Sequence, residues 1–143
     1  MKHALLAALS TVVLVVFLGI ADPAGADVSY ELGASPNIPA AQGTARLKKT
    51  KNGNVQIKLS VHHLAPPGRI TPGSDVFLVW ARGLAPGSEA QNLGALKVDK
   101  NLSGKLTAMT ALSSFDLFIT CEQSQTAPTP SGIELLPLHY ANP

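Results

Sequence analysis

Charged residues are scarce in this chain. Only 14% of its 143 residues are Asp, Glu, Lys or Arg, whereas hydrophobic residues make up 45%. Disordered acidic or basic tails and coiled coils need many more charges, so the composition excludes both classes. A chain of this length and composition instead suits one folded domain with a single hydrophobic core.

Aromatic residues are equally rare, at 5%, and the formal net charge is only +2. Nucleic-acid-binding surfaces combine a strong basic patch with stacking aromatics, so we expect no nucleic-acid partner. The one lysine cluster, Lys48, Lys49 and Lys51, lies beside a predicted turn. We interpret it as the solvated end of a hairpin.

The chain has a single cysteine, Cys121, which excludes an intramolecular disulfide framework. Cys121 alternates with Phe115, Leu117 and Ile119 along one predicted strand. This pattern predicts a small buried apolar residue. The alternative is an exposed thiol that cross-links two chains in an intermolecular disulfide.

The N-terminus is typical of an export signal. A short basic start is followed by an uncharged, mostly apolar stretch over residues 4–21 and by the small residues Ala24 and Ala26. We predict cleavage between Ala26 and Asp27, giving a signal peptide at 1–26 and one domain at 27–143. The protein is then periplasmic or extracellular, and it contacts a membrane only if the segment stays uncleaved as an anchor.

After this signal, alternation with period two recurs and helical periodicity is nearly absent. The clearest case is a hairpin, in which strands over 43–49 and 55–64 flank Asn52-Gly53. Breakers rich in proline and glycine separate further short strands. The sequence therefore predicts an all-β fold, an antiparallel, immunoglobulin-like β-sandwich of about seven or eight strands, with an open barrel as the alternative.

One run, Val76 to Trp80, is apolar at every position and is too short for a helix, so we expect a central strand covered on both faces. Trp80, on the same side as Val76 and Leu78, is predicted to fill the space between the sheets, with its indole N–H finding an acceptor near the strand end. The predicted structural core comprises Phe77, Trp80, Phe115, Ile119 and Cys121.

The sequence signals for a metal-binding or catalytic site are weaker than those for the fold. His62 and His63 are adjacent and point to opposite faces of a strand, so a metal site would need one of them, or His139, together with Glu122 or Asp116. No G-x-S-x-G motif occurs, and Ser88 and Ser131 beside proline and glycine are interpreted as turn residues. We therefore expect no metal, no cofactor, no catalytic residues and no enzymatic activity.

Four stretches carry a family resemblance: "VFLVW" at 76–80, "NLGALKVD" at 92–99, "FDLFITCE" at 115–122 and "PSG" at 130–132. Their order, from about residue 43 to the C-terminus, resembles the extracytoplasmic C-terminal domain of anti-sigma-K factors. Those factors also have a cytoplasmic sigma-binding domain, for which no residues precede the signal segment. The resemblance implies a free-standing exported β-sandwich for sensing or interaction in the bacterial envelope, with no catalytic residues.

Our main hypothesis is therefore a non-enzymatic exported module that binds an envelope or extracellular protein through its loops over 65–74, 83–91 and 124–132. A second hypothesis is a structural subunit that forms homo-oligomers or a surface assembly through exposed strand edges. A third is a carrier of a small ligand or metal that uses His62, Glu122 or His139.

Overall fold

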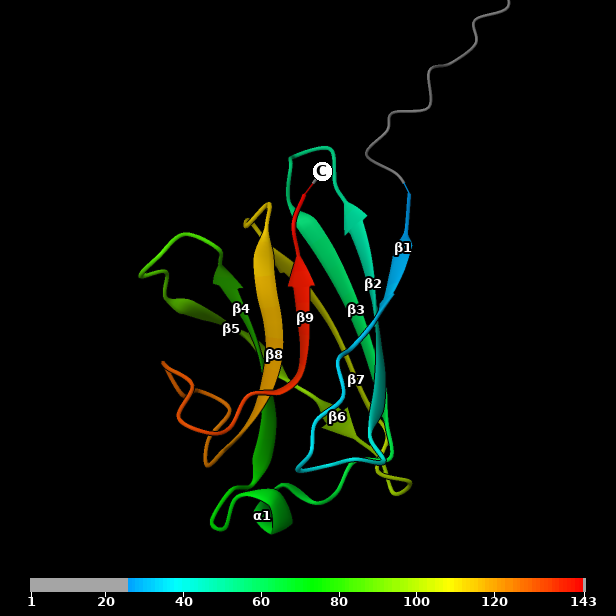
Figure 1. Ribbon diagram of the computed structural model, residues 1–143, viewed down its shortest axis with the longest axis vertical. Helices are drawn as coiled ribbons and strands as arrows, with labels where there is room; N and C mark the ends of the chain where they lie inside the picture. The colour runs from blue at the N-terminus through cyan, green and yellow to red at the C-terminus, as the bar shows by residue number, and fades with distance from the viewer. Residues whose placement is uncertain (1–25, 143) are drawn as a thin grey trace, which may run out of the picture.

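The computed structural model describes residues 26–142, which form a β-sandwich of two antiparallel sheets (Figure 1). The five-stranded sheet has the order β1-β2-β3-β7-β6 and the four-stranded sheet the order β5-β4-β8-β9. The elements are β1 (Val28–Glu31), β2 (Gln42–Lys49), β3 (Val55–His62), α1 (Pro67–Ile70), β4 (Val76–Gly83), β5 (Ala90–Ala95), β6 (Lys97–Val98), β7 (Gly104–Thr110), β8 (Phe115–Glu122) and β9 (Leu135–Tyr140). The predicted fold class is confirmed, with nine strands instead of seven or eight.

Residues 1–25 of the predicted signal peptide, Ala24 among them, lie outside the described residues. Ala26 and Asp27 begin the described chain, and both are exposed. Within residues 26–142 no helix is long and apolar enough to cross a membrane.

The predicted hairpin is formed by β2 and β3. The Thr50 N–H donates to the Asn54 carbonyl at 2.8 Å, and Gly53 has a φ of 81°. Glycine adopts this left-handed conformation without the strain that a Cβ would cause. The register places Leu47 opposite Ile57, and both side chains are buried between the sheets.

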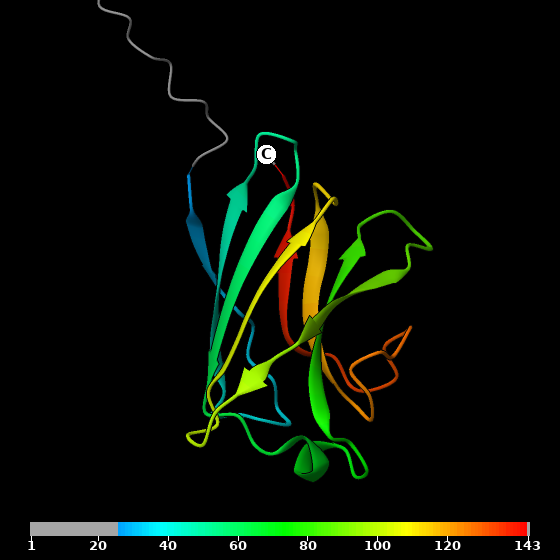
Figure 2. The same cartoon turned by 180° about the vertical axis from the view of Figure 1, so that it is seen from behind.

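The stretch over 92–99 is shared between the two sheets. Its first part belongs to β5 and pairs with β4, whereas β6 pairs with β7 in the other sheet. Leu96, between them, is buried, and its N–H donates to the Phe77 carbonyl at 2.9 Å. The chain therefore crosses from one sheet to the other and closes one side of the sandwich (Figure 2).

The opposite side is closed by the connection between β1 and β2. The Gly33 N–H donates to the Pro137 carbonyl at 2.8 Å, and the Leu136 N–H donates to Ser35 Oγ at 2.7 Å. Ser35 is only 4% exposed. Part of the outer edge of β9 is thus hydrogen-bonded within the chain, and Pro137 has no N–H to offer.

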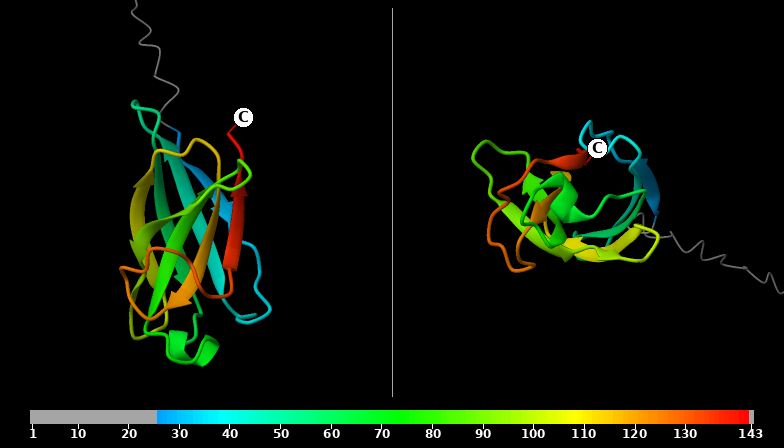
Figure 3. Two further views of the ribbon diagram at one scale, coloured as in Figure 1. Left: turned by 90° about the vertical axis from the view of Figure 1, so that its left-hand side faces the viewer. Right: turned by 90° about the horizontal axis from the view of Figure 1, so that it is seen from below.

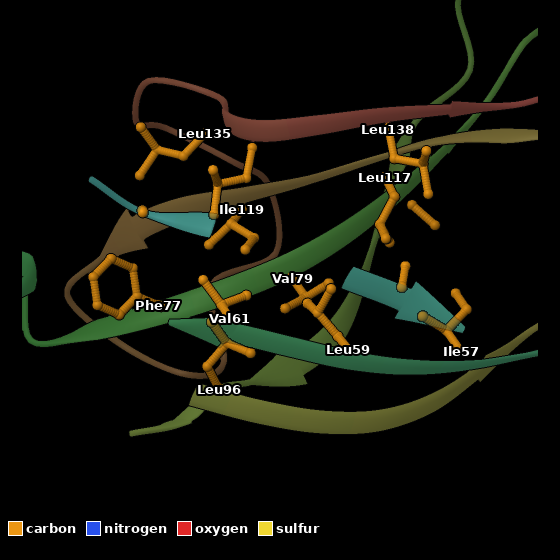
Figure 4. Close-up of a cluster of buried hydrophobic side chains, with 14 of the residues drawn as sticks. Ile57, Leu59, Val61, Phe77, Val79, Leu96, Leu117, Ile119, Leu135 and Leu138 are labelled. Atoms are coloured by element: carbon orange, nitrogen blue, oxygen red, sulfur yellow. The ribbon is translucent and has the colours of Figure 1, made fainter. Parts of the chain in front are cut away.

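The main core lies between the sheets (Figure 4). Four of the five expected core residues, Phe77, Phe115, Ile119 and Cys121, lie in it and are each at most 3% exposed. They alternate along β4 and β8 with side chains that face the other way, as period two requires.

Trp80 is fully buried, but it lies on the opposite face of its sheet from the position we expected. It forms a second cluster with Leu78 and Phe118, separate from the core between the sheets. Because every residue from 76 to 80 is apolar, alternation alone could not show which face is internal. The indole N–H donates to Thr120 Oγ1 at 2.8 Å.

Candidate functional site

Two of the three predicted binding loops meet at one end of the sandwich. The segment containing α1 and the connection between β8 and β9, residues 123–134, lie at this end, whereas the β4–β5 turn lies at the other (Figure 3). We call residues 123–134 the tethered loop. Between these two segments is a hollow of about 390 Å³, the end cleft, which is lined by Thr71, Pro72, Ser74, Cys121, Glu122, Gln123, Ser124, Ala127, Pro128, Thr129, Ser131 and Gly132.

Glu122 is the central polar residue of the end cleft. It ends β8 and is only 3% exposed. Its Oε1 accepts hydrogen bonds from the backbone N–H and from the Oγ of Ser131, both at 2.7 Å. Hydrogen bonds to an ionised carboxylate are stronger than neutral ones, so this pair holds the far part of the tethered loop to the strand.

The backbone at the end of β8 also contacts the segments on both sides of the end cleft. The Asp75 N–H donates to the Glu122 carbonyl at 3.0 Å. Gly132 approaches so closely that a Cβ there would lie 3.0 Å from the Cys121 carbonyl oxygen. Only glycine permits this contact without displacing the backbone, which gives the "PSG" stretch a structural reason.

Two further strands fix the tethered loop. Asn92 of β5 donates from Nδ2 to the carbonyls of Gln125 and Ala127, at 3.0 and 3.1 Å. Arg82 of β4 forms an ion pair with Glu134 at 2.7 Å. Ala127 in turn packs against the cluster that contains Trp80, so the loop covers part of the outer face of the four-stranded sheet.

Cys121 lies beside the end cleft, but its thiol is poorly suited to nucleophilic chemistry. It is 3% exposed. Burial raises the pKa of the Cys121 thiol from 9.0 to about 11; a hydrogen bond with Thr71 lowers this pKa, and the charge of Glu122 raises it. At neutral pH the thiol therefore stays protonated, and the thiolate is the reactive form.

The other candidate residues are dispersed. His139 Nδ1 lies 2.6 Å from Asp116 Oδ1 on an exposed part of the four-stranded sheet. His62 Nδ1 lies 3.0 Å from Ser103 Oγ on the five-stranded sheet. Among residues 26–142, no three His, Cys, Asp or Glu side chains are grouped as metal ligands would be.

The two serines differ in their roles. The Ser88 hydroxyl donates to the Ala85 carbonyl at 2.7 Å, as a turn residue does. Ser131 lies in an irregular part of the tethered loop, and no local pattern in the sequence predicts its pairing with Glu122. Asn92 was missed as well, because a single polar residue on a strand predicts no loop partner 33 residues away.

A scan against protein-family models, a search of curated proteins and a search of solved structures each found no match to this chain.

Proposed function

We propose that this chain is an exported, non-enzymatic β-sandwich module that binds a protein partner of the bacterial envelope or extracellular space. The resemblance to the C-terminal domain of anti-sigma-K factors supports a sensing or interaction role. The observation that carries the proposal is the state of the tethered loop. It has no regular secondary structure, yet Arg82, Asn92 and Glu122 hold it from three different strands.

A loop held in this way is suited to recognition. Association orders flexible segments at an entropic cost, and a loop already fixed in the free protein avoids most of that cost. Ile133 and Glu134, at the end of this loop, are exposed, and Glu134 is paired with Arg82. Four of its other exposed side chains, Gln123, Gln125, Thr126 and Thr129, are polar and uncharged. They supply hydrogen-bonding groups beside a cleft without a strong charge that would limit the partner to one sign.

The pairing of Ser131 with Glu122 supports a binding role over catalysis. A nucleophilic serine needs a base that is itself oriented by a third group. Within residues 26–142, the hydrogen bonds to the Glu122 carboxylate come from Ser131 alone, through both its N–H and its hydroxyl. This arrangement fixes the tethered loop, and it leaves the Glu122 carboxylate, which would have to act as the base, without a third group to orient it.

Site-specific cross-linking tests the placement of the binding site. A photoreactive residue at Thr129, on the rim of the end cleft, should give a cross-linked product in intact cells. The matched control is the same residue at Leu84, which is exposed in the β4–β5 turn at the other end. A product from Leu84 but not from Thr129 would place binding elsewhere.

The role of the fixed loop has its own test. Glu122→Gln removes the charge that holds Ser131 and should weaken partner capture while the far-ultraviolet circular dichroism stays that of a β-sheet protein. Glu89→Gln, with the same charge change in the exposed β4–β5 turn, is the control. Equal capture by both variants would show that the fixed loop does not contribute to binding.

A further inference from the structure

The outer face of the five-stranded sheet carries a row of cations. Arg46 on β2, Lys58 on β3, Lys105 on β7 and Lys97 on β6 are all exposed. We call these four residues the cationic stripe. Their strands are consecutive in the sheet, so the stripe crosses it from one strand to the next.

The strand register makes this row unfavourable for the isolated protein. Arg46 lies directly opposite Lys58, and Lys97 lies directly opposite Lys105. Like charges at directly opposed positions destabilise a sheet. Lys58 and Lys105 are diagonal neighbours, because Lys105 lies opposite Ser60, two positions along β3.

Little negative charge compensates the stripe. Arg46 pairs with Asp27 at 3.2 Å. The other two ion pairs within residues 26–142 lie on the four-stranded sheet and include none of the three lysines. Lys58, Lys97 and Lys105 are therefore exposed cations that form no ion pair within residues 26–142.

Neutral hydrogen-bonding groups accompany the cations. Ser60 and Thr107 lie on the same face, opposite Lys105 and Lys58 respectively. A hollow of about 360 Å³ at the β6 end is lined by Ala95, Lys97, Lys105, Leu106 and Thr107. The face thus offers charges and hydroxyls in a line, with a depression at one end.

We propose that the cationic stripe binds a linear anionic polysaccharide, whose carboxylate or sulfate groups neutralise the opposed lysines. Neighbouring strands are about 4.8 Å apart, so the stripe presents charges at short, regular intervals to an extended chain. The sugar hydroxyls have Ser60 and Thr107 as hydrogen-bonding partners. Recognition is by charge and hydrogen bonding and needs no ring stacking.

The same face is a poor match for other polyanions. None of the aromatic side chains within residues 26–142 is exposed. The face therefore lacks the stacking platforms of single-stranded nucleic-acid binders and the aromatic side chains that anchor proteins at membrane interfaces. A duplex groove is read by an inserted helix or ribbon, and this sheet face offers neither.

The test uses the purified protein with heparin as the sulfated probe and polygalacturonate as the carboxylated probe. Lys58→Glu/Lys105→Glu should weaken binding to at least one probe by roughly tenfold or more, and binding should fall with added salt. The matched control is Lys51→Glu/Arg69→Glu, with the same charge change at the β2–β3 turn and in α1. Circular dichroism verifies that both variants fold.

Three results would overturn the proposal. The first is that the wild type binds neither polysaccharide at low salt. The second is that both double variants lose affinity equally, which would reflect net charge alone. The third is that anionic phosphatidylglycerol vesicles or duplex DNA bind more tightly than either polysaccharide through the same lysines. Because the stripe lies on a different face from the tethered loop, none of these results bears on the proposed protein partner.

Discussion

Trp80 shows how one side chain links the strand pair to the loop that covers it. Its apolar ring is fully buried, and its polar N–H has a hydrogen-bond acceptor in Thr120, as a buried tryptophan needs. The cluster around it lies beneath the tethered loop, not between the sheets. Trp80 therefore contributes to the stability of the site as well as to that of the fold.

Trp80→Ala should lower the free energy of unfolding by about 3–5 kcal/mol, because it leaves a large cavity. Thr120→Val keeps the volume but leaves the indole N–H unpaired, and should cost about 1–3 kcal/mol. Urea denaturation measures both losses. Thr107→Val, on an exposed strand position, is the control. A loss well below 1 kcal/mol for Trp80→Ala, or strong quenching of its fluorescence by iodide, would contradict the buried environment.

Cys121 makes stability depend on pH in alkaline solution. Since the folded-state pKa is raised from 9.0 to about 11, the folded protein retains the proton that the unfolded chain releases. The contribution is full below pH 9 and is lost as the pH rises through the folded pKa. Wild type should therefore lose stability relative to Cys121→Ala between pH 8 and 11, by roughly 1–3 kcal/mol. Groups that titrate in both variants cancel in this comparison, and a constant difference would contradict the prediction.

At the scale of elements, the tethered loop depends on contacts far from it in sequence. Asn92→Ala removes both hydrogen bonds to the loop and should increase its cleavage by a protease of broad specificity, with a global loss of about 1 kcal/mol. Mass spectrometry of the fragments locates the cuts. Asn101→Ala, in the exposed turn between β6 and β7, is the control. Unchanged cleavage within 124–132 would show that Asn92 does not fix the loop.

The pairing of β6 with β7 allows a direct test of charge repulsion. Lys97→Glu converts the like pair with Lys105 into an opposite pair and should raise stability by about 0.2–1 kcal/mol at low salt. Lys100→Glu makes the same charge change in the neighbouring turn and should have a smaller effect. Thermal unfolding at low and high salt measures both, and the gain should shrink as salt screens the charges. An equal gain for both variants would attribute the effect to net charge.

At the scale of the whole molecule, closure of the sandwich bears on self-association. The apolar strand β9 has part of its outer edge covered by residues 33–35. Gly33→Val would place a Cβ 2.9 Å from the Pro137 carbonyl oxygen and should displace this segment. The uncovered edge should then pair with another chain.

Light scattering across a concentration series measures this effect. We expect the wild type to remain monomeric and Gly33→Val to form larger species. Ala34→Val, at the exposed neighbouring position, is the control. A concentration-dependent mass for the wild type would instead support the structural-subunit hypothesis.

The sequence by itself determined the class of fold and the local elements. Alternation with period two, the Asn52-Gly53 turn and the proline-rich breakers depend on backbone geometry and on neighbouring residues, so they can be read without the partners across the sheet. The burial of Phe115 and Ile119 follows the same alternation, and that of Phe77 follows from the apolar run around it.

Only the tertiary structure decided which faces are internal, where a strand changes sheets and what holds the candidate site. The inward face of Val76 to Trp80 depends on the other sheet and on the tethered loop. The change of sheet at Leu96 depends on the hydrogen bond from its N–H to the Phe77 carbonyl. The hydrogen bond of Ser131 to Glu122 depends on the path of the tethered loop, which brings Ser131 back to the end of β8. Each is an interaction between residues that are brought together by chain folding, so neither composition nor periodicity carries a signal for it.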